Sequence, residues 1–182
     1  VQKAERPLPK LKPRGGAVQP SSEFLNAKQS VEYYETEIRH KPKVVKNYVD
    51  LANVFLQEAR VTGDHHDYIP KAQEMIGEAL RLEPENFEAL LAKASIMLTL
   101  HQFQEAKRLA QIALTKNSYS AFAYGLLADA HAELGEYDEA VQASDKMLGL
   151  RPDLRSYARA SYLRELHGDQ AGAIAVMRMA VD

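Results

Sequence analysis

Apolar residues recur at steps of three and four along most of this 182-residue chain, which is the spacing of one face of an α-helix. The pattern is most regular over residues 121–154, where it predicts two successive helices. Gly135 separates them, because glycine readily takes the left-handed conformation that ends a helix. Pro152 follows the second helix, because proline cannot continue the hydrogen-bond ladder. The stretch therefore predicts a helical hairpin.

A hairpin of about 34 residues, with glycine at its first turn and proline after its second helix, resembles the tetratricopeptide repeat (TPR). Similar hairpins extend the resemblance over residues 28–182, and residues 156–181 resemble bacterial TPR proteins in particular. The resemblance implies an all-α fold, a TPR-like right-handed α–α superhelix (solenoid) of about four helical hairpins with an N-terminal capping helix. The expected segments are a Pro/Lys-rich tether (1–20) and the solenoid (21–182), which divides into a capping helix (21–42), a repeat with an insertion (44–86), two regular repeats (87–120 and 121–153) and a terminal repeat interpreted as truncated (154–182).

Two repeats depart from the pattern. The repeat at 44–86 has about eight residues more than the period requires. The extra residues lie within 58–70, so the first helix is expected to lengthen and a turn at Gly63–Asp64 to follow. Because insertions in solenoids map to loops, the insertion is expected to leave the stacking undisturbed. In the next repeat His101 stands where glycine is usual, and Asn117 is expected to supply the left-handed turn in place of the missing proline.

Small residues stand near the start of each predicted second helix. A small side chain lets two helix backbones approach closely, so these positions are expected to be buried contacts between helices. Aromatic residues such as Tyr48 are expected to fill the gap between neighbouring hairpins. The recurring small residues are Ala72, Ala106, Ala140 and Ala173.

Residues 1–20 contain four prolines and five basic residues, with a Gly15–Gly16 pair. Prolines at this spacing favour extended chain, and glycine adds a flexible joint. One interpretation is a solvated linker. The other is that the PLPKLKP stretch, residues 7–13, docks in a groove of its own chain or of a neighbour.

Composition excludes several classes of protein. A net charge of −2 argues against general affinity for nucleic acid, which needs a basic surface to displace counterions. No apolar run approaches the ~20 residues that a membrane-spanning helix requires. The absence of cysteine excludes disulfides, thiolate metal sites and cysteine nucleophiles.

Candidate chemistry is sparse, and no enzyme is predicted. His65 and His66 are adjacent, so their side chains diverge and chelate a metal poorly without further ligands; they are expected in an exposed loop. His131 falls on the inner face of its helix, where a packed, hydrogen-bonded histidine is expected. No Ser-His-Asp order, phosphate-binding loop or HExxH motif occurs. No catalytic residue, metal or cofactor is predicted.

The TPR resemblance places partner binding in a concave groove formed by the first helix of each hairpin. Asn53 matches a position that holds a carboxylate in chaperone-binding TPRs, but Val49 stands where lysine would be needed. Leu91 and Phe122 occupy other positions of that clamp, which argues against chaperone-tail binding. The groove residues implied are Val49, Asn53, Leu56, Leu91, Ser95, Leu98, Phe122, Asp129, Arg155, Arg159 and Tyr162.

Arg155 and Arg159 lie one helical turn apart and could hold one acidic group of a partner. The alternative is a solvated pair balanced by Glu133 and Glu165.

These observations favour a non-enzymatic scaffold that binds a protein or peptide partner in the groove. The alternative is a regulatory or spacer domain of a longer protein whose activity lies elsewhere, and a site at His65–His66 is a weaker third hypothesis. Self-association through the tether or the C-terminal end, where Ala173, Met177 and Ala180 are expected to be exposed, is also possible. Cytoplasmic and exported (periplasmic or lipoprotein) locations remain open.

Overall fold

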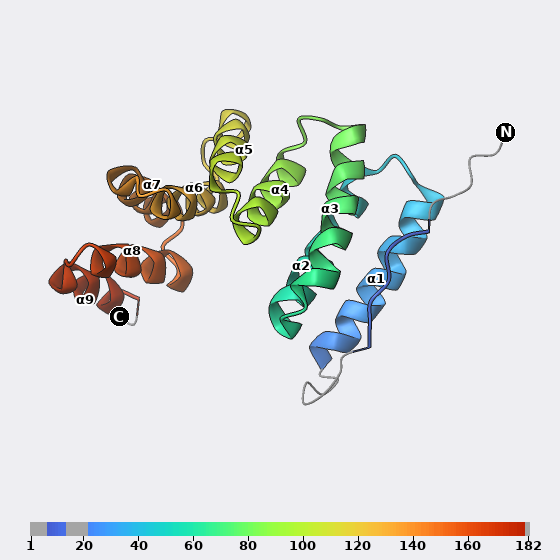
Figure 1. Ribbon diagram of the computed structural model, residues 1–182, viewed down its shortest axis with the longest axis horizontal. Coiled ribbons are helices and arrows are strands. Elements are labelled where there is room, and N and C mark those ends of the chain that lie inside the picture. Colours follow the sequence, from blue (N-terminus) through green and yellow to red (C-terminus); the bar gives the residue numbers. More distant parts are fainter. Residues whose placement is uncertain (1–6, 14–21, 181–182) are drawn as a thin grey trace. The chain divides into compact units, whose positions relative to one another are not determined.

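A computed structural model describes residues 7–13 and 22–180 of the chain (Figure 1). All regular secondary structure in these ranges is helical, which confirms the all-α prediction. The helices are α1 (Ser22–His40), α2 (Val45–Thr62), α3 (His65–Leu82), α4 (Phe87–Thr99), α5 (Phe103–Lys116), α6 (Ala121–Glu133), α7 (Tyr137–Leu150), α8 (Leu154–Leu166) and α9 (Gln170–Arg178).

The chain forms two compact units, Val1–Ala92 and Lys93–Asp182. In the first unit α1 packs on α2 and α2 packs on α3, and Figure 1 shows these three helices side by side. Its core lies between α2 and α3, where the rings of Phe55 and Tyr68 stack with centroids 6.3 Å apart. Apolar side chains at helical spacing therefore bury themselves between neighbouring helices, as the sequence pattern predicts.

The first helix of the repeat with the insertion is lengthened, as predicted, but the insertion does not form a loop. The extra residues lengthen both helices of the hairpin, so that α2 and α3 have 18 residues each, whereas α4 to α8 have 13 or 14. The turn at Gly63 is confirmed: its φ is 73°, and its N–H donates to the carbonyl of Ala59. Asp64 then caps α3 by accepting a hydrogen bond from the Asp67 N–H at 3.1 Å. His65 and His66 consequently stand in the exposed first turn of α3 rather than in a loop.

In the second unit each helix from α5 to α9 packs on the next along the chain. The turns of the second and third predicted repeats both use left-handed backbone, at His101 (φ 57°) and Gly135 (φ 73°). Asn117 does not supply such a turn. It is extended, with φ −145°, and its side-chain oxygen accepts a hydrogen bond from the N–H of Tyr119 at 3.0 Å.

The small residues near the starts of α3, α5, α7 and α9 are buried, as the close approach of helices requires. Ala72, Ala106 and Ala140 are fully buried, and Ala173 is 6% exposed. The expectation that Ala173 is exposed at the C-terminal end is therefore wrong, because the side chain packs between α8 and α9. Met177 is exposed and Ala180 is half-buried.

Candidate partner-binding site

The predicted groove residues divide into buried and accessible groups. Val49, Leu56 and Leu91 are buried at 2–6% exposure, so they contribute to helix packing and offer little surface to a partner. The apolar stripe of α2 is thus wider than the repeat pattern implies. Ser95, Leu98, Asp129 and Arg159 are half-buried, and Asn53, Phe122, Arg155 and Tyr162 are exposed.

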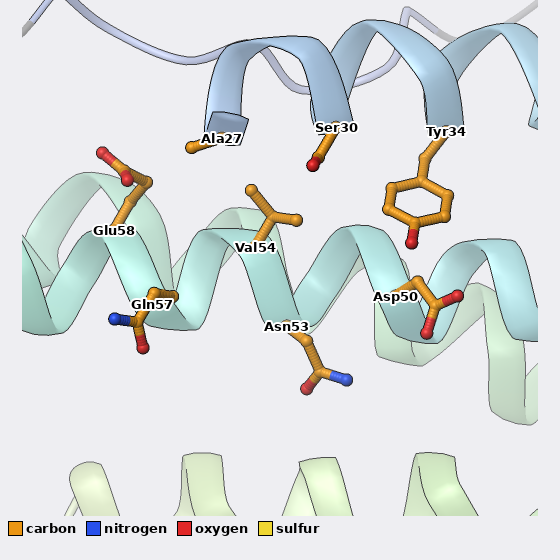
Figure 2. A pocket seen from close by; sticks show the side chains of 8 residues that line it. All are labelled: Ala27, Ser30, Tyr34, Asp50, Asn53, Val54, Gln57 and Glu58. Atoms are coloured by element: carbon orange, nitrogen blue, oxygen red, sulfur yellow. The ribbon is translucent and has the colours of Figure 1, made fainter. Parts of the chain in front are cut away.

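Within the first unit, α1 and α2 enclose a pocket of about 360 Å³ (Figure 2). Ala27, Ser30 and Tyr34 project from α1 toward α2, and Tyr34 points at Asp50. We call this cavity the α1–α2 pocket; its lining residues are Ala27, Ser30, Tyr34, Asp50, Asn53, Val54, Gln57 and Glu58.

Asn53 is the predicted groove residue that the structure places in the α1–α2 pocket. Gln57, which the repeat pattern also assigns to the groove, lines the pocket too. Asp50 and Val54 were missed as part of the site, although they lie four residues apart on the same helix face. That periodicity was the available signal. The contribution of α1 could not be inferred from the repeat pattern, because the capping helix has no partner helix of its own.

The α1–α2 pocket has an acidic side. Asp50 is held by Lys46, with an Nζ–Oδ2 distance of 3.0 Å, and its hydrogen bond raises the pKa of Lys46. Burial, followed by the nearby Asp50 carboxylate, raises the pKa of Tyr34, so its hydroxyl stays protonated as a donor at neutral pH. Glu58 adds a carboxyl group that is 1% exposed. Hydrogen-bonding groups and an apolar wall therefore meet in one cavity.

A second surface of the first unit is covered by residues 7–13, which we call the strap. The strap is extended and runs along α1, as the dark blue segment in Figure 1 shows. Its Lys12 N–H donates to the Tyr68 hydroxyl at 3.3 Å, and Lys71 Nζ donates to the carbonyl of Lys10 at 2.6 Å. Of the two interpretations of the tether, the structure therefore has this part docked on its own chain; residues 1–6 and 14–20 lie outside the described residues.

In the second unit, Arg155 and Arg159 of α8 do not form a free pair. The guanidinium of Arg159 forms two hydrogen bonds with the carboxylate of Asp129 on α6, at 2.7 and 2.8 Å. These hydrogen bonds raise the pKa of Arg159. The solvated alternative assumed that Glu133 and Glu165 balance the arginines, but Arg159 pairs with Asp129 instead. A joint grip by Arg155 and Arg159 on one external carboxylate would require Arg159 to leave Asp129.

His131 is packed and hydrogen-bonded, in agreement with the sequence. Its Nδ1 lies 2.6 Å from Glu136 Oε2, and Lys107 Nζ lies 2.7 Å from Glu136 Oε1. Hydrogen bonds from Lys107 and then from His131 lower the pKa of Glu136. This cluster joins α5 to the turn between α6 and α7. Among the residues that the structure describes, no group of three or more His, Asp or Glu side chains is arranged to hold a metal.

No family model matches the sequence, and no curated protein sequence matches it. Solved structures do match. MamA from Desulfovibrio magneticus RS-1 has a TM-score of 0.65 at 17% identity, covering 85% of this chain and 84% of MamA. TTC0263, a thermophilic TPR protein of Thermus thermophilus, has a TM-score of 0.74 at 15% identity, covering 87% and 83%. YrrB, a TPR protein with an unusual peptide-binding site, has a TM-score of 0.61 at 18% identity, covering 88% and 79%.

At these identities the likeness establishes the fold. The chain has the TPR fold, a solenoid of helical hairpins, and the predicted resemblance is confirmed. Within the described part of the chain, none of the helices has the length and apolar character needed to cross a membrane.

Proposed function

We propose that this protein is a non-enzymatic scaffold that binds a segment of a partner protein along the first helix of its hairpins. The observation that carries the proposal is the α1–α2 pocket, which places the exposed Asn53 and Gln57 beside a cavity of about 360 Å³. The TPR fold supports it, and YrrB, whose structure this chain resembles, has a peptide-binding site. The alternative, a regulatory or spacer domain of a longer protein, stays a prediction.

The chemistry of the pocket indicates which partner groups it suits. Asp50 supplies a carboxylate, and the side-chain amides of Asn53 and Gln57 both donate and accept hydrogen bonds. An amide can pair with the backbone of an extended peptide, and a carboxylate favours a lysine or arginine side chain. We therefore expect a partner segment that places a basic residue in the pocket and its main chain along α2.

Site-specific photo-crosslinking tests this function. A photoreactive amino acid at Asn53 should trap a partner segment in extracts of the source cells, whereas the same group at the exposed Gln111 on α5 should not. In affinity capture, Asn53→Arg should lose the trapped protein, because the arginine repels a basic partner residue and fills the pocket. Gln111→Arg is the matched control and should retain it. If all forms recover the same proteins, the pocket is not the binding site.

A further inference from the structure

The surface beneath the strap recognises main chain. The Tyr68 hydroxyl accepts from the N–H of Lys12 at 3.3 Å and lies 3.5 Å from its carbonyl, and Lys71 Nζ donates to the carbonyl of Lys10. Such contacts do not depend on the side chains of the bound segment. They are the contacts by which a groove holds an extended peptide. Tyr68 itself is 2% exposed, so its position is fixed by the core of α2 and α3.

At one end of the bound segment, two carboxylates of the protein favour a basic side chain. Lys12 Nζ lies 2.8 Å from Asp67 Oδ1 and 3.5 Å from Asp64 Oδ2. Both carboxylates stand at the start of α3, and Asp64 is held there by its role as the helix cap. The acidic pair therefore exists independently of the strap, and it favours a lysine at this position of any segment bound there.

At the other end, the strap leaves its apolar seat incompletely filled. A cavity of about 440 Å³ remains beside Leu8; its lining includes Ile38 at the end of α1, Tyr48 of α2 and Met75 of α3, together with the charged Arg39, Glu74 and Glu78. Leu8 and Pro9 are only half-buried. Ile38, Tyr48 and Met75 are already buried, so a larger apolar side chain in place of Leu8 would gain chiefly by burying its own apolar area in this cavity, at roughly 25 cal/mol per Å². The groove is thus larger than its present occupant.

We propose that this surface, the strap groove, is a binding site for an extended partner peptide that carries a bulky apolar residue and, four positions later, a lysine. Residues 7–13 occupy it as an intramolecular ligand that the partner must displace. The strap groove shares no lining residue with the α1–α2 pocket, so the inference goes beyond the proposed function and does not depend on it.

Peptide binding to the full chain tests the inference. The probe is a fluorescent peptide of residues 7–13 with Leu8→Phe, and fluorescence anisotropy measures its affinity. Lys12→Glu in the protein should weaken the strap, because glutamate faces Asp64 and Asp67, while the groove stays unchanged. If the strap occupies the groove about nine-tenths of the time, releasing it tightens the apparent affinity about tenfold. The exposed Lys43→Glu changes the net charge equally and should bind as the wild type does.

A charge swap provides the decisive control. Adding Asp67→Lys to Lys12→Glu restores the ion pair within the chain, so the strap should close again and exclude a probe that carries Lys12→Glu, whereas Asp67→Lys alone should bind that probe. Circular dichroism should show the same helix content in all variants. The proposal fails if Lys12→Glu binds the probe no better than wild type does. It also fails if the wild type forms a concentration-dependent dimer that Lys12→Glu abolishes, because the strap would then belong on a second copy.

Discussion

Asp67 is the residue at which the strap and α3 are joined electrostatically. Burial acts to raise the pKa of Asp67, but hydrogen bonds from Lys12 and Lys71 outweigh it and lower the pKa below its ordinary value. Lys12, Lys71, Asp64 and Tyr68 are the charged or titratable groups around it. A carboxylate with a depressed pKa stabilises the folded state above its unfolded pKa and loses that contribution as pH falls through its folded pKa.

We therefore predict that Asp67→Asn lowers the melting temperature at neutral pH and that this difference disappears in acid. Asparagine retains the size of the protonated side chain without its negative charge, so wild type and variant converge once Asp67 is protonated. Thermal unfolding followed by circular dichroism from neutral pH to below the ordinary carboxyl range measures the difference. A difference that persists unchanged in acid would show that the Asp67 charge does not contribute.

Arg159 links α8 to α6 through one carboxylate, and its side chain is 26% exposed. A bidentate pair of this kind combines charge with fixed geometry. Arg159→Met keeps much of the apolar stem but removes both hydrogen bonds to Asp129, whose side chain is 40% exposed and becomes hydrated, so we expect a loss of about 1 kcal/mol of unfolding free energy. Urea denaturation measures the loss. Arg155→Met, on the same helix but exposed, should change stability by less than about 0.5 kcal/mol; equal losses would contradict the assignment of the pair.

Individual residues show which environments and contacts a sequence pattern can predict. The packed environment of His131 followed from its place on the inner helix face. The partner of Arg159 did not follow, because Asp129, Glu133 and Glu165 all have suitable charge and only three-dimensional geometry selects among them. Likewise, Val49 and Leu56 occupy groove positions of the repeat pattern, but apolar side chains gain more by packing against a neighbouring helix than by facing solvent.

At the scale of helices, the α2–α3 hairpin depends on the left-handed backbone of Gly63. A Cβ at this φ is strained even though the space around it is open. Gly63→Ala should therefore lower the unfolding free energy by about 1–2 kcal/mol. Gly77 offers the matched comparison, because it lies inside α3 with open space around its Cα. Gly77→Ala should raise stability by roughly 0.4–1 kcal/mol. Chemical denaturation of both variants tests the two opposite signs.

The sequence predicted the helices and the lengthening of α2, but not the lengthening of α3. Periodicity and the turn at Gly63 defined the hairpin. Residues 58–62 continue α2 and residues 65–70 begin α3, and neither segment interrupts its helix. Pro70 lies inside α3 and does not end it. The added residues therefore extended both helices. The longer α3 carries Asp67, Tyr68 and Lys71. These residues contact the strap, as does Asp64, which caps α3.

At the scale of the whole molecule, the repeated hairpin could be identified from spacing alone, because each unit must bury its apolar face on a neighbour. The α1–α2 pocket and the strap groove could not be identified from spacing. Each arises where the chain departs from the repeat: α1 lacks a partner helix of its own, and the strap has no repeat periodicity. Regular positions maintain the stack, and both candidate binding surfaces of this chain lie at its irregular ones.

The stacked architecture also determines how far a local loss of stability extends along the chain. In a repeat protein, stability is approximately a sum of terms within hairpins and between neighbouring ones, so a local defect lowers local stability most. Ile76 is buried in α3 of the first unit at 2% exposure. Ile76→Val should cost about 0.5–1.5 kcal/mol by removing a buried methyl group.

Hydrogen–deuterium exchange resolved by mass spectrometry should locate the effect of Ile76→Val in the first unit, with faster exchange in α2 and α3. A loss of about 1 kcal/mol corresponds to roughly fivefold faster exchange through local opening, which is measurable. Exchange in α6 to α9 of the second unit should remain at the wild-type rate, because those helices open without disturbing Ile76. An equal acceleration throughout the described helices would instead show that the chain unfolds as one cooperative body, and the additive description would not apply.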